Sequence, residues 1–112
     1  MSICVQTINV ANFKQICESN IDKCLIDVRE PHEFQLQRIH GVQNIPKDVL
    51  IDRINAVTKN HADAIYLHCR AGVRSYAAAE MLIQHGYENV YSVEGGLNAW
   101  IQAGYPVETV QY

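Results

Sequence analysis

The sequence predicts an α/β domain with a central parallel sheet of about five strands and helices on both faces. Short apolar runs alternate with helical patterns along the chain, as they do in strand–helix–strand units. Two short runs are apolar without alternation: Ile65–Leu67, and Cys24–Val28 apart from its single acid. Such runs are typical of parallel strands covered on both faces. A length of 112 residues and a hydrophobic fraction of 48% suit a single domain over residues 1–112.

Turn and cap residues divide the first half of the chain into three strands and two helices. Asn9 is a suitable N-cap for the first helix, and Pro31 fits the first turn of the second. Pro46 stops the third strand because it lacks a backbone donor. The predicted elements are a strand about Cys4–Thr7, a helix from Val10 to about Glu18, a strand Cys24–Val28, a brief helix from Pro31 through Phe34, and a strand Gly41–Ile45.

The second half of the chain is expected to supply three helices and two strands. Asp48 is a candidate cap for a helix whose apolar stripe includes Leu50 and Ile54. Gly86 suits the left-handed residue that ends a helix, and Trp100 is assigned to the core. The predicted elements are the helix after Asp48, a strand Ile65–Leu67, a helix from about Val73 to His85, a strand Asn89–Val93, and a helix from Leu97 to about Ala103 that Gly95 and Gly96 open.

Composition and charge argue against several classes of function. The net charge is -3 and no basic run is present, so we expect no nucleic-acid partner. No apolar run is long enough to span a bilayer, and no signal peptide is visible. We therefore expect no membrane association and a cytoplasmic location.

The four cysteines are expected to be free thiols in a reducing compartment. None forms a Cys-x-x-Cys pair and the five histidines are scattered, so we expect no metal and no cofactor. Cys4, Cys17 and Cys24 lie in apolar contexts and are interpreted as packing residues. Cys69 differs from them because it lies at the junction between a strand and a helix.

Cys69 is predicted to be a catalytic nucleophile at the floor of an anion pocket. Backbone N–H groups at the start of a helix are unpaired and attract negative charge. Arg70 and Arg74 act in the same direction, so the thiol should lose its proton readily. Gly72 lets the backbone turn so that successive N–H groups converge on one centre.

Two reactions use a thiolate in such a cradle. One is cleavage of a phosphate ester through a phosphocysteine, and the other is transfer of a sulfane sulfur through a cysteine persulfide. A phosphoryl group needs a wide cradle for its oxygens, whereas a persulfide adds a single sulfur. Four residues separate Cys69 from Arg74, and this short spacing favours sulfur transfer. A phosphatase, an arsenate reductase and a sulfur-carrying or partner-binding module with little turnover are the alternatives.

Three stretches resemble the single-domain rhodaneses, which are thiosulfate sulfurtransferases. Cys69–Ser75 is similar to the family's active loop, which is shorter than the loop of cysteine phosphatases. Residues 25–34 are similar to its Asp-x-Arg strand end and the following turn, and residues 94–107 to its C-terminal segment. Residues 37–42 depart from the family's Gly-His-Ile-Pro-Gly-Ala pattern, so no histidine there receives a role.

The resemblance implies a rhodanese-like fold and a two-step sulfur transfer without a metal or organic cofactor. Cys69 would take sulfur from a small anionic donor such as thiosulfate and pass it to cyanide or a thiol, with a protein thiol as a further candidate acceptor. Arg70 and Arg74 would attract the donor. The predicted substrate-binding residues are Arg70, Ala71, Gly72, Val73, Arg74 and Ser75.

Other polar residues near the loop have two interpretations each. Arg29 either contacts an anion or pairs with an acid such as Asp27, and the structural pairing is favoured. His68 directly precedes the cysteine and is expected to point into the fold. Ser75 either bonds the cysteine sulfur or caps the helix, and Arg74 either faces the substrate or pairs with a glutamate.

Overall fold

The central sheet has five parallel strands in the order β1–β6–β5–β2–β4. The computed structural model describes residues 5–21 and 23–110, so Cys4, which was expected to open the first strand, lies outside the described residues. The predicted five-stranded parallel sheet is confirmed. The strands are β1 Gln6–Ile8, β2 Cys24–Asp27, β4 Gln43–Asn44, β5 Ile65–His68 and β6 Val90–Val93.

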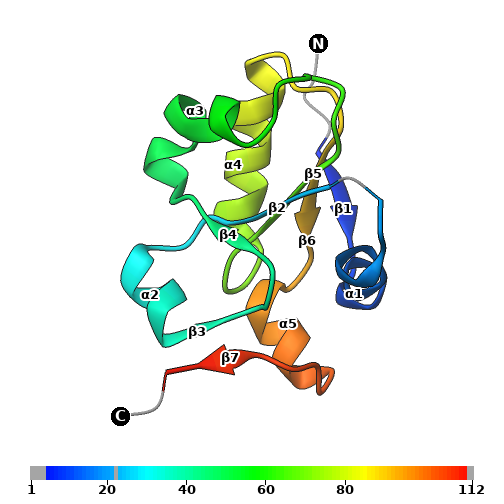
Figure 1. Ribbon diagram of the computed structural model, residues 1–112, viewed down its shortest axis with the longest axis vertical. Coiled ribbons are helices and arrows are strands. Elements are labelled where there is room, and N and C mark those ends of the chain that lie inside the picture. Colours follow the sequence, from blue (N-terminus) through cyan, green and yellow to red (C-terminus); the bar gives the residue numbers. More distant parts are fainter. Residues whose placement is uncertain (1–4, 22, 111–112) are drawn as a thin grey trace.

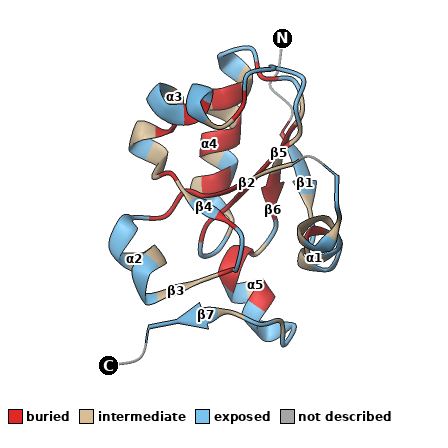
Figure 2. Ribbon diagram, viewed as in Figure 1, coloured by how far each residue is buried: buried red, intermediate tan, exposed pale blue. Residues whose placement is uncertain are grey.

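Helices cover both faces of this sheet, as expected (Figure 1). On one face, α1 (Val10–Glu18) and α5 (Gly96–Gln102) contribute Phe13, Leu97 and Trp100 to a buried cluster. On the other face, α4 (Val73–Gln84) and α3 (Leu50–Arg53) pack against a second cluster. Figure 2 shows the buried residues concentrated along β2, β5 and β6 and on α4 and α5.

Neighbouring strand residues belong to opposite clusters, which explains the unbroken apolar runs. Leu25 and Tyr66 belong to the cluster beneath α1 and α5. Ile26 and Leu67, the next residue in each strand, belong to the cluster beneath α3 and α4. Successive side chains of a strand point to opposite faces, so a sheet covered on both sides needs apolar residues at every position.

Several helices begin or end at the cap and turn residues predicted from the sequence. The side chain of Asn9 accepts a hydrogen bond from the N–H of Asn12 at 2.8 Å and caps α1. Pro31 occupies the first turn of α2 (Pro31–Leu36). Gly86 follows α4 with a φ of +94°, in the left-handed region.

The segment after Pro46 corrects the single helix predicted there. It consists of a 3₁₀ turn η1 (Lys47–Val49), a one-turn α3 and a second 3₁₀ turn η2 (Ile54–Ala56). Asp48 lies inside η1 and makes no capping hydrogen bond, so its assignment as a cap was wrong. Leu50 and Ile54 are buried, so these two residues of the predicted apolar stripe face the core although the segment is divided into short turns.

A second, two-stranded sheet was not predicted. Its antiparallel strands are β3 (Gln37–Arg38) and β7 (Glu108–Thr109). Two residues are too few to show a hydrophobic period, so only the tertiary contact reveals them. The pair joins the end of α2 to the segment that follows α5 (Figure 1).

A buried ion pair holds the carboxyl end of β2. Asp27 and Arg29 are fully buried, with Arg29 Nη2 at 2.7 Å from Asp27 Oδ2. The same guanidinium donates to the backbone carbonyl of Gln37 at 2.6 Å. Arg29 therefore has the structural role that was favoured, and it ties β2 to β3.

His68 points into the fold beside this pair. The side chain is fully buried, and its Nε2 lies 3.7 Å from Asp27 Oδ2. Burial lowers the pKa of His68 below its ordinary 6.5, and the nearby Asp27 carboxylate offsets only part of that effect. His68 is therefore neutral in the folded protein at neutral pH.

We expect the free energy of unfolding to fall as the pH drops below about 6.5, because the unfolded chain takes up a proton on His68 before the folded chain does. The contribution of one histidine is at most about 1.4 kcal/mol per pH unit. Urea unfolding between pH 7.5 and 5 should show this loss in the wild type, with a shallower dependence in His68→Phe and His68→Gln. Equal slopes in all three proteins would contradict the assignment.

Candidate active site

The loop after β5 turns sharply at Gly72 and leads directly into α4. Gly72 has a φ of +99°, which side chains of L residues rarely adopt. A Cβ atom there would also lie 3.3 Å from the backbone nitrogen of Gly95. Glycine is therefore required for the turn that brings the start of α4 against Cys69.

Three groups of the loop surround the sulfur of Cys69. The N–H of Gly72 donates to Sγ at 3.0 Å, and the N–H of Ser75 donates at 3.4 Å. The hydroxyl oxygen of Ser75 lies 3.6 Å from Sγ and 2.8 Å from the hydroxyl oxygen of Ser92. Ser75 thus contacts the sulfur, which is the first of the two interpretations, and its hydroxyl also donates to the carbonyl of Gly72 at 3.3 Å. It does not cap α4, whose start has no side-chain capping hydrogen bond.

The hydrogen bonds in the loop lower the pKa of Cys69 below the ordinary 9.0. Burial acts in the opposite direction, but the side chain of Ser75 and the backbone N–H groups of Ser75, Gly72 and Ala71 outweigh it. Burial raises the pKa of both Cys17 and Cys24 to about 11. Among these three cysteines, only Cys69 has a pKa that is lowered from its ordinary value.

The start of α5 holds the loop through hydrogen bonds to two of its backbone carbonyls. The N–H of Leu97 donates to the carbonyl of Cys69 at 2.8 Å, and the N–H of Asn98 donates to the carbonyl of Arg70 at 2.9 Å. A Cβ atom on Gly96 would lie 2.3 Å from the Cys69 carbonyl oxygen. Gly96 was predicted only to open a helix, although the Gly95–Gly96 pair is also a signal for close backbone packing.

The outer side of the loop is exposed and partly apolar. Val73 retains 76% of its accessible surface and Tyr76 retains 41%. Both line a shallow groove together with Ala71 and Glu94.

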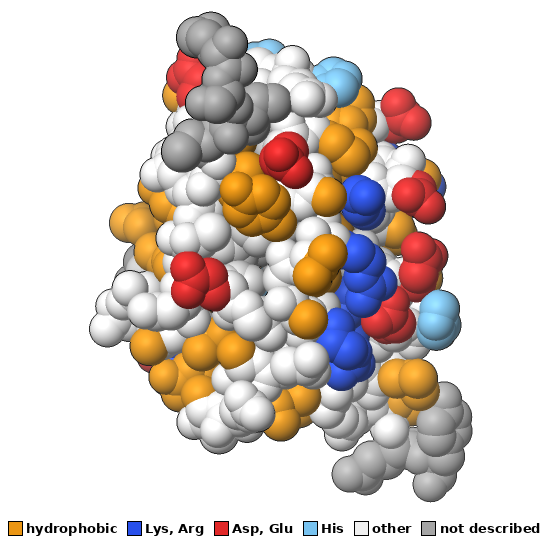
Figure 3. All heavy atoms as spheres, turned by 180° about the vertical axis from the view of Figure 1, so that it is seen from behind, with side chains coloured by type: hydrophobic (Ala, Val, Ile, Leu, Met, Phe, Trp, Pro, Cys, Tyr) orange, Lys and Arg blue, Asp and Glu red, His pale blue; other side chains and the backbone are white. Residues whose placement is uncertain are grey.

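Figure 3 shows a row of Lys and Arg side chains on one face of the molecule, with acidic side chains directly beside it. Positive charge on this face is therefore partly neutralised.

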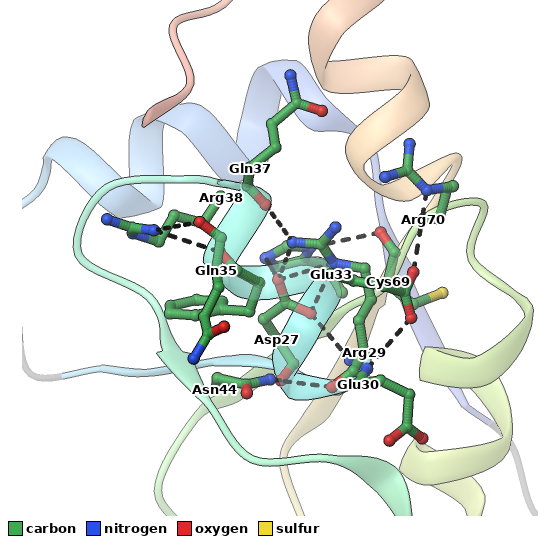
Figure 4. Close-up of polar contacts among 12 residues, drawn as sticks. Asp27, Arg29, Glu30, Glu33, Gln35, Gln37, Arg38, Asn44, Cys69 and Arg70 are labelled. Carbon is green, nitrogen blue, oxygen red and sulfur yellow. Dashed lines mark hydrogen bonds and ion pairs between the residues drawn. The ribbon is translucent and has the colours of Figure 1, made fainter. Parts of the chain in front are cut away.

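A carboxylate lies at the mouth of the loop. Glu33 of α2 accepts hydrogen bonds from both terminal nitrogens of Arg74, at 2.7 and 3.1 Å. Its Oε2 lies 4.0 Å from Arg70 Nε, and Figure 4 shows Glu33 facing Arg70 beside Cys69. Hydrogen bonding by Arg74 lowers the pKa of Glu33 to about 2. Arg74 thus pairs with a glutamate, which sequence reasoning had left open, and the contribution of Glu33 itself was missed.

The described residues offer little for a metal ion. No group of three or more His, Cys, Asp or Glu side chains gathers within residues 5–21 and 23–110. In the same part of the chain, no helix is long and apolar enough to cross a membrane. The groups that face the sulfur are instead N–H and hydroxyl donors, which suit a sulfur anion.

The fold and the loop agree with a family comparison. The model of the rhodanese-like domain matches residues 10–103. The chain belongs to the rhodanese-like family. The solved structure of a rhodanese-related protein from Thermoplasma volcanium superposes with a TM-score of 0.79 at 34% identity, over 92% of this chain and 97% of that one.

Two curated relatives carry names that state an activity. A sulfurtransferase of Allochromatium vinosum is 32% identical over 103 residues, which cover 92% of this chain and 94% of the relative. The thiosulfate sulfurtransferase GlpE of Vibrio cholerae is 31% identical over 84 residues, which cover 75% of this chain and 77% of the relative. The family is therefore one that includes sulfurtransferases.

Removal of the Ser75 hydroxyl should raise the pKa of Cys69. In Ser75→Ala the thiolate loses one donor but keeps the backbone N–H groups, so we expect the pKa to rise toward the ordinary 9.0. The pH dependence of thiolate absorbance measures it, with Cys69→Ala as the baseline for the other cysteines. Ser92→Ala should give a smaller rise, because Ser92 acts only through the Ser75 hydroxyl. An unchanged pKa in Ser75→Ala would contradict this role.

Substitution of Gly96 should disturb the loop more than substitution of another left-handed glycine. Gly96→Ala places a Cβ against the backbone of Cys69 and Arg70, whereas Gly104→Ala meets nothing within 4 Å at a φ of +80°. Both substitutions incur the left-handed penalty of about 1–2 kcal/mol. Urea unfolding should show a further loss of about 1–3 kcal/mol for Gly96→Ala alone. Equal destabilisation by the two variants would contradict the close approach.

Proposed function

We propose that this chain is a sulfurtransferase that carries a sulfane sulfur on Cys69. The observation that carries the proposal is the sulfur of Cys69 held by two backbone N–H groups and close to the Ser75 hydroxyl, in a loop with only four residues before Arg74. These donors favour a thiolate before transfer and a persulfide anion after it. The named activities of the two relatives support the same class of reaction.

In the first step, the Cys69 thiolate attacks the outer sulfur of thiosulfate. A new S–S bond forms at Cys69, the sulfur–sulfur bond of thiosulfate breaks, and sulfite leaves with the electron pair. The outer sulfur of the persulfide then carries the negative charge within the reach of the loop N–H groups. Arg70, which is partly exposed and bonded to Asn98 at 3.4 Å, is the cation beside the entrance with the weaker protein contacts.

In the second step, an acceptor removes the outer sulfur. Cyanide attacks it to give thiocyanate, or a thiolate attacks it to give a new persulfide, and the electron pair of the broken bond returns to Cys69. The two half-reactions make a ping-pong cycle without a metal or organic cofactor.

We propose that the whole chain, residues 1–112, acts as one domain in the cytoplasm, with a small or protein thiol as the acceptor.

Cys69→Ala should abolish thiocyanate formation from thiosulfate and cyanide, because the variant has no sulfur to form the persulfide. Incubation of the wild type with thiosulfate should add the mass of one sulfur atom to the peptide that contains Cys69. Cys17→Ser and Cys24→Ser are matched controls that remove a thiol elsewhere, and both should keep the activity. Turnover retained by Cys69→Ala would overturn the proposal.

The same assay separates an enzyme from a sulfur-carrying module. A carrier would gain one sulfur atom and release it slowly, whereas an enzyme completes many cycles with a small acceptor. Suppose that Cys69 gains no sulfur and the protein instead hydrolyses an aryl phosphate or reduces arsenate in a reaction that depends on Cys69. This result would overturn the proposed sulfur transfer in favour of a phosphatase or an arsenate reductase.

A further inference from the structure

Glu33 is fixed at the mouth of the loop by contacts on both sides. Its carboxylate binds Arg74 through two hydrogen bonds of 2.7 and 3.1 Å. The backbone N–H of Glu30 donates to Glu33 Oε1 at 3.2 Å, as part of a capping box that starts α2. The side chain is 20% exposed. Glu33 is therefore a fixed charge, unlike a mobile surface glutamate.

This carboxylate halves the positive charge that the loop offers to a substrate. Two arginines alone would present a charge of about +2 at the mouth, but both terminal nitrogens of Arg74 are bound to Glu33, and Arg70 Nε lies 4.0 Å from the same carboxylate. Its pKa of about 2 means that Glu33 stays ionised throughout the physiological range. Arg70, Arg74 and Glu33 together therefore carry a net charge of about +1, which the Cys69 thiolate lowers further, so the mouth suits a monoanion better than a dianion.

We propose that Glu33 is a specificity-determining residue that selects singly charged sulfur donors over doubly charged ones. The inference rests on the proposed sulfur transfer and assigns its donor class: a monoanion, either an organic persulfide R–S–S⁻ or a thiosulfonate R–SO₂–S⁻, in preference to the thiosulfate dianion. The Cys69 thiolate takes the outer sulfur of the donor and the sulfur–sulfur bond of the donor breaks. The leaving group, a thiolate R–S⁻ from a persulfide or a sulfinate R–SO₂⁻ from a thiosulfonate, departs with the electron pair.

A pair of donors that differ mainly in charge tests the selection. Thiosulfate and methanethiosulfonate both offer a terminal sulfur on an oxidised sulfur centre, with leaving groups sulfite and methanesulfinate, but they carry charges of -2 and -1. Glu33→Gln keeps an oxygen that can accept from Arg74 and from the capping N–H, so α2 can remain in place. Glu88→Gln removes the same charge at an exposed position before β6, far along the sheet from the loop, and is the matched control.

The measured quantity is the ratio of kcat/KM for thiosulfate to kcat/KM for methanethiosulfonate. Glu33→Gln removes one negative charge beside Arg70 and Arg74, which favours the dianion more than the monoanion. We therefore expect this kcat/KM ratio to rise about three- to tenfold in Glu33→Gln, and to rise less at high salt. The ratio in Glu88→Gln should stay within about twofold of the wild type, as expected for a screened, distant charge. An unchanged ratio in Glu33→Gln, or an equal rise in Glu88→Gln, would overturn the inference.

A second measurement needs no sulfur transfer. Alkylation of Cys69, followed by mass spectrometry of its peptide, compares the anionic reagent iodoacetate with the neutral reagent iodoacetamide. The iodoacetate-to-iodoacetamide rate ratio should rise in Glu33→Gln and stay unchanged in Glu88→Gln. If neither donor loads the wild type, the proposed function fails, while the alkylation ratio still decides whether Glu33 screens anions from Cys69. Equal alkylation ratios in all proteins would reject the role of Glu33.

Discussion

The site depends on two hydrogen bonds that the start of α5 makes to the carbonyls of Cys69 and Arg70. When the carbonyl of a peptide unit is turned outward, its N–H is turned the other way. The hydrogen bond from Asn98 to the Arg70 carbonyl therefore orients the N–H of Ala71, which belongs to the same peptide unit and is one of the groups that lower the pKa of Cys69. The bond from Leu97 fixes the carbonyl of Cys69 itself. The dense packing at Gly96 is the condition for this contact, because a side chain there would occupy the place of the Cys69 carbonyl. An element remote in sequence thus creates the environment of Cys69.

A second framework supports the loop from the side of β2. Asp27 and Arg29 form a buried ion pair. Arg29 also donates to the backbone carbonyl of Gln37, so it links β2 to the small sheet of β3 and β7. Desolvation of two charges is costly, so the pair contributes more to a defined geometry than to net stability. It lies beside His68, the last residue of β5, where the loop begins. The two strand ends that carry the site are also direct partners in the sheet, since Asp27 is paired with His68 in the register of β2 and β5.

The sequence alone predicted the parts of the fold with a local signal. Apolar runs without alternation marked the central strands, and Asn9, Pro31 and Gly86 marked helix ends, because each of these residues acts within a few positions of itself. The Cys69 loop was recognised for the same reason. The strand pair β3–β7 and the role of Glu33 were missed, since they depend on partners far along the chain. The division of the segment after Pro46 into short turns was also missed, because an apolar stripe does not separate a 3₁₀ turn from an α-helix. Glu33 and Arg74 are 41 residues apart, and no spacing rule connects them.

Burial of the Cys69 sulfur, which leaves the residue only 1% exposed, has a consequence for its chemical safety. An unloaded thiolate at the floor of a narrow loop is shielded from bulky electrophiles and from thiols that would trap it as a mixed disulfide. In the proposed intermediate, an S–S bond of about 2 Å carries the outer sulfur toward the mouth of the loop. The outer sulfur of the persulfide, which is transferred to the acceptor, would then be more accessible than Cys69 Sγ, which is regenerated in every cycle and remains buried.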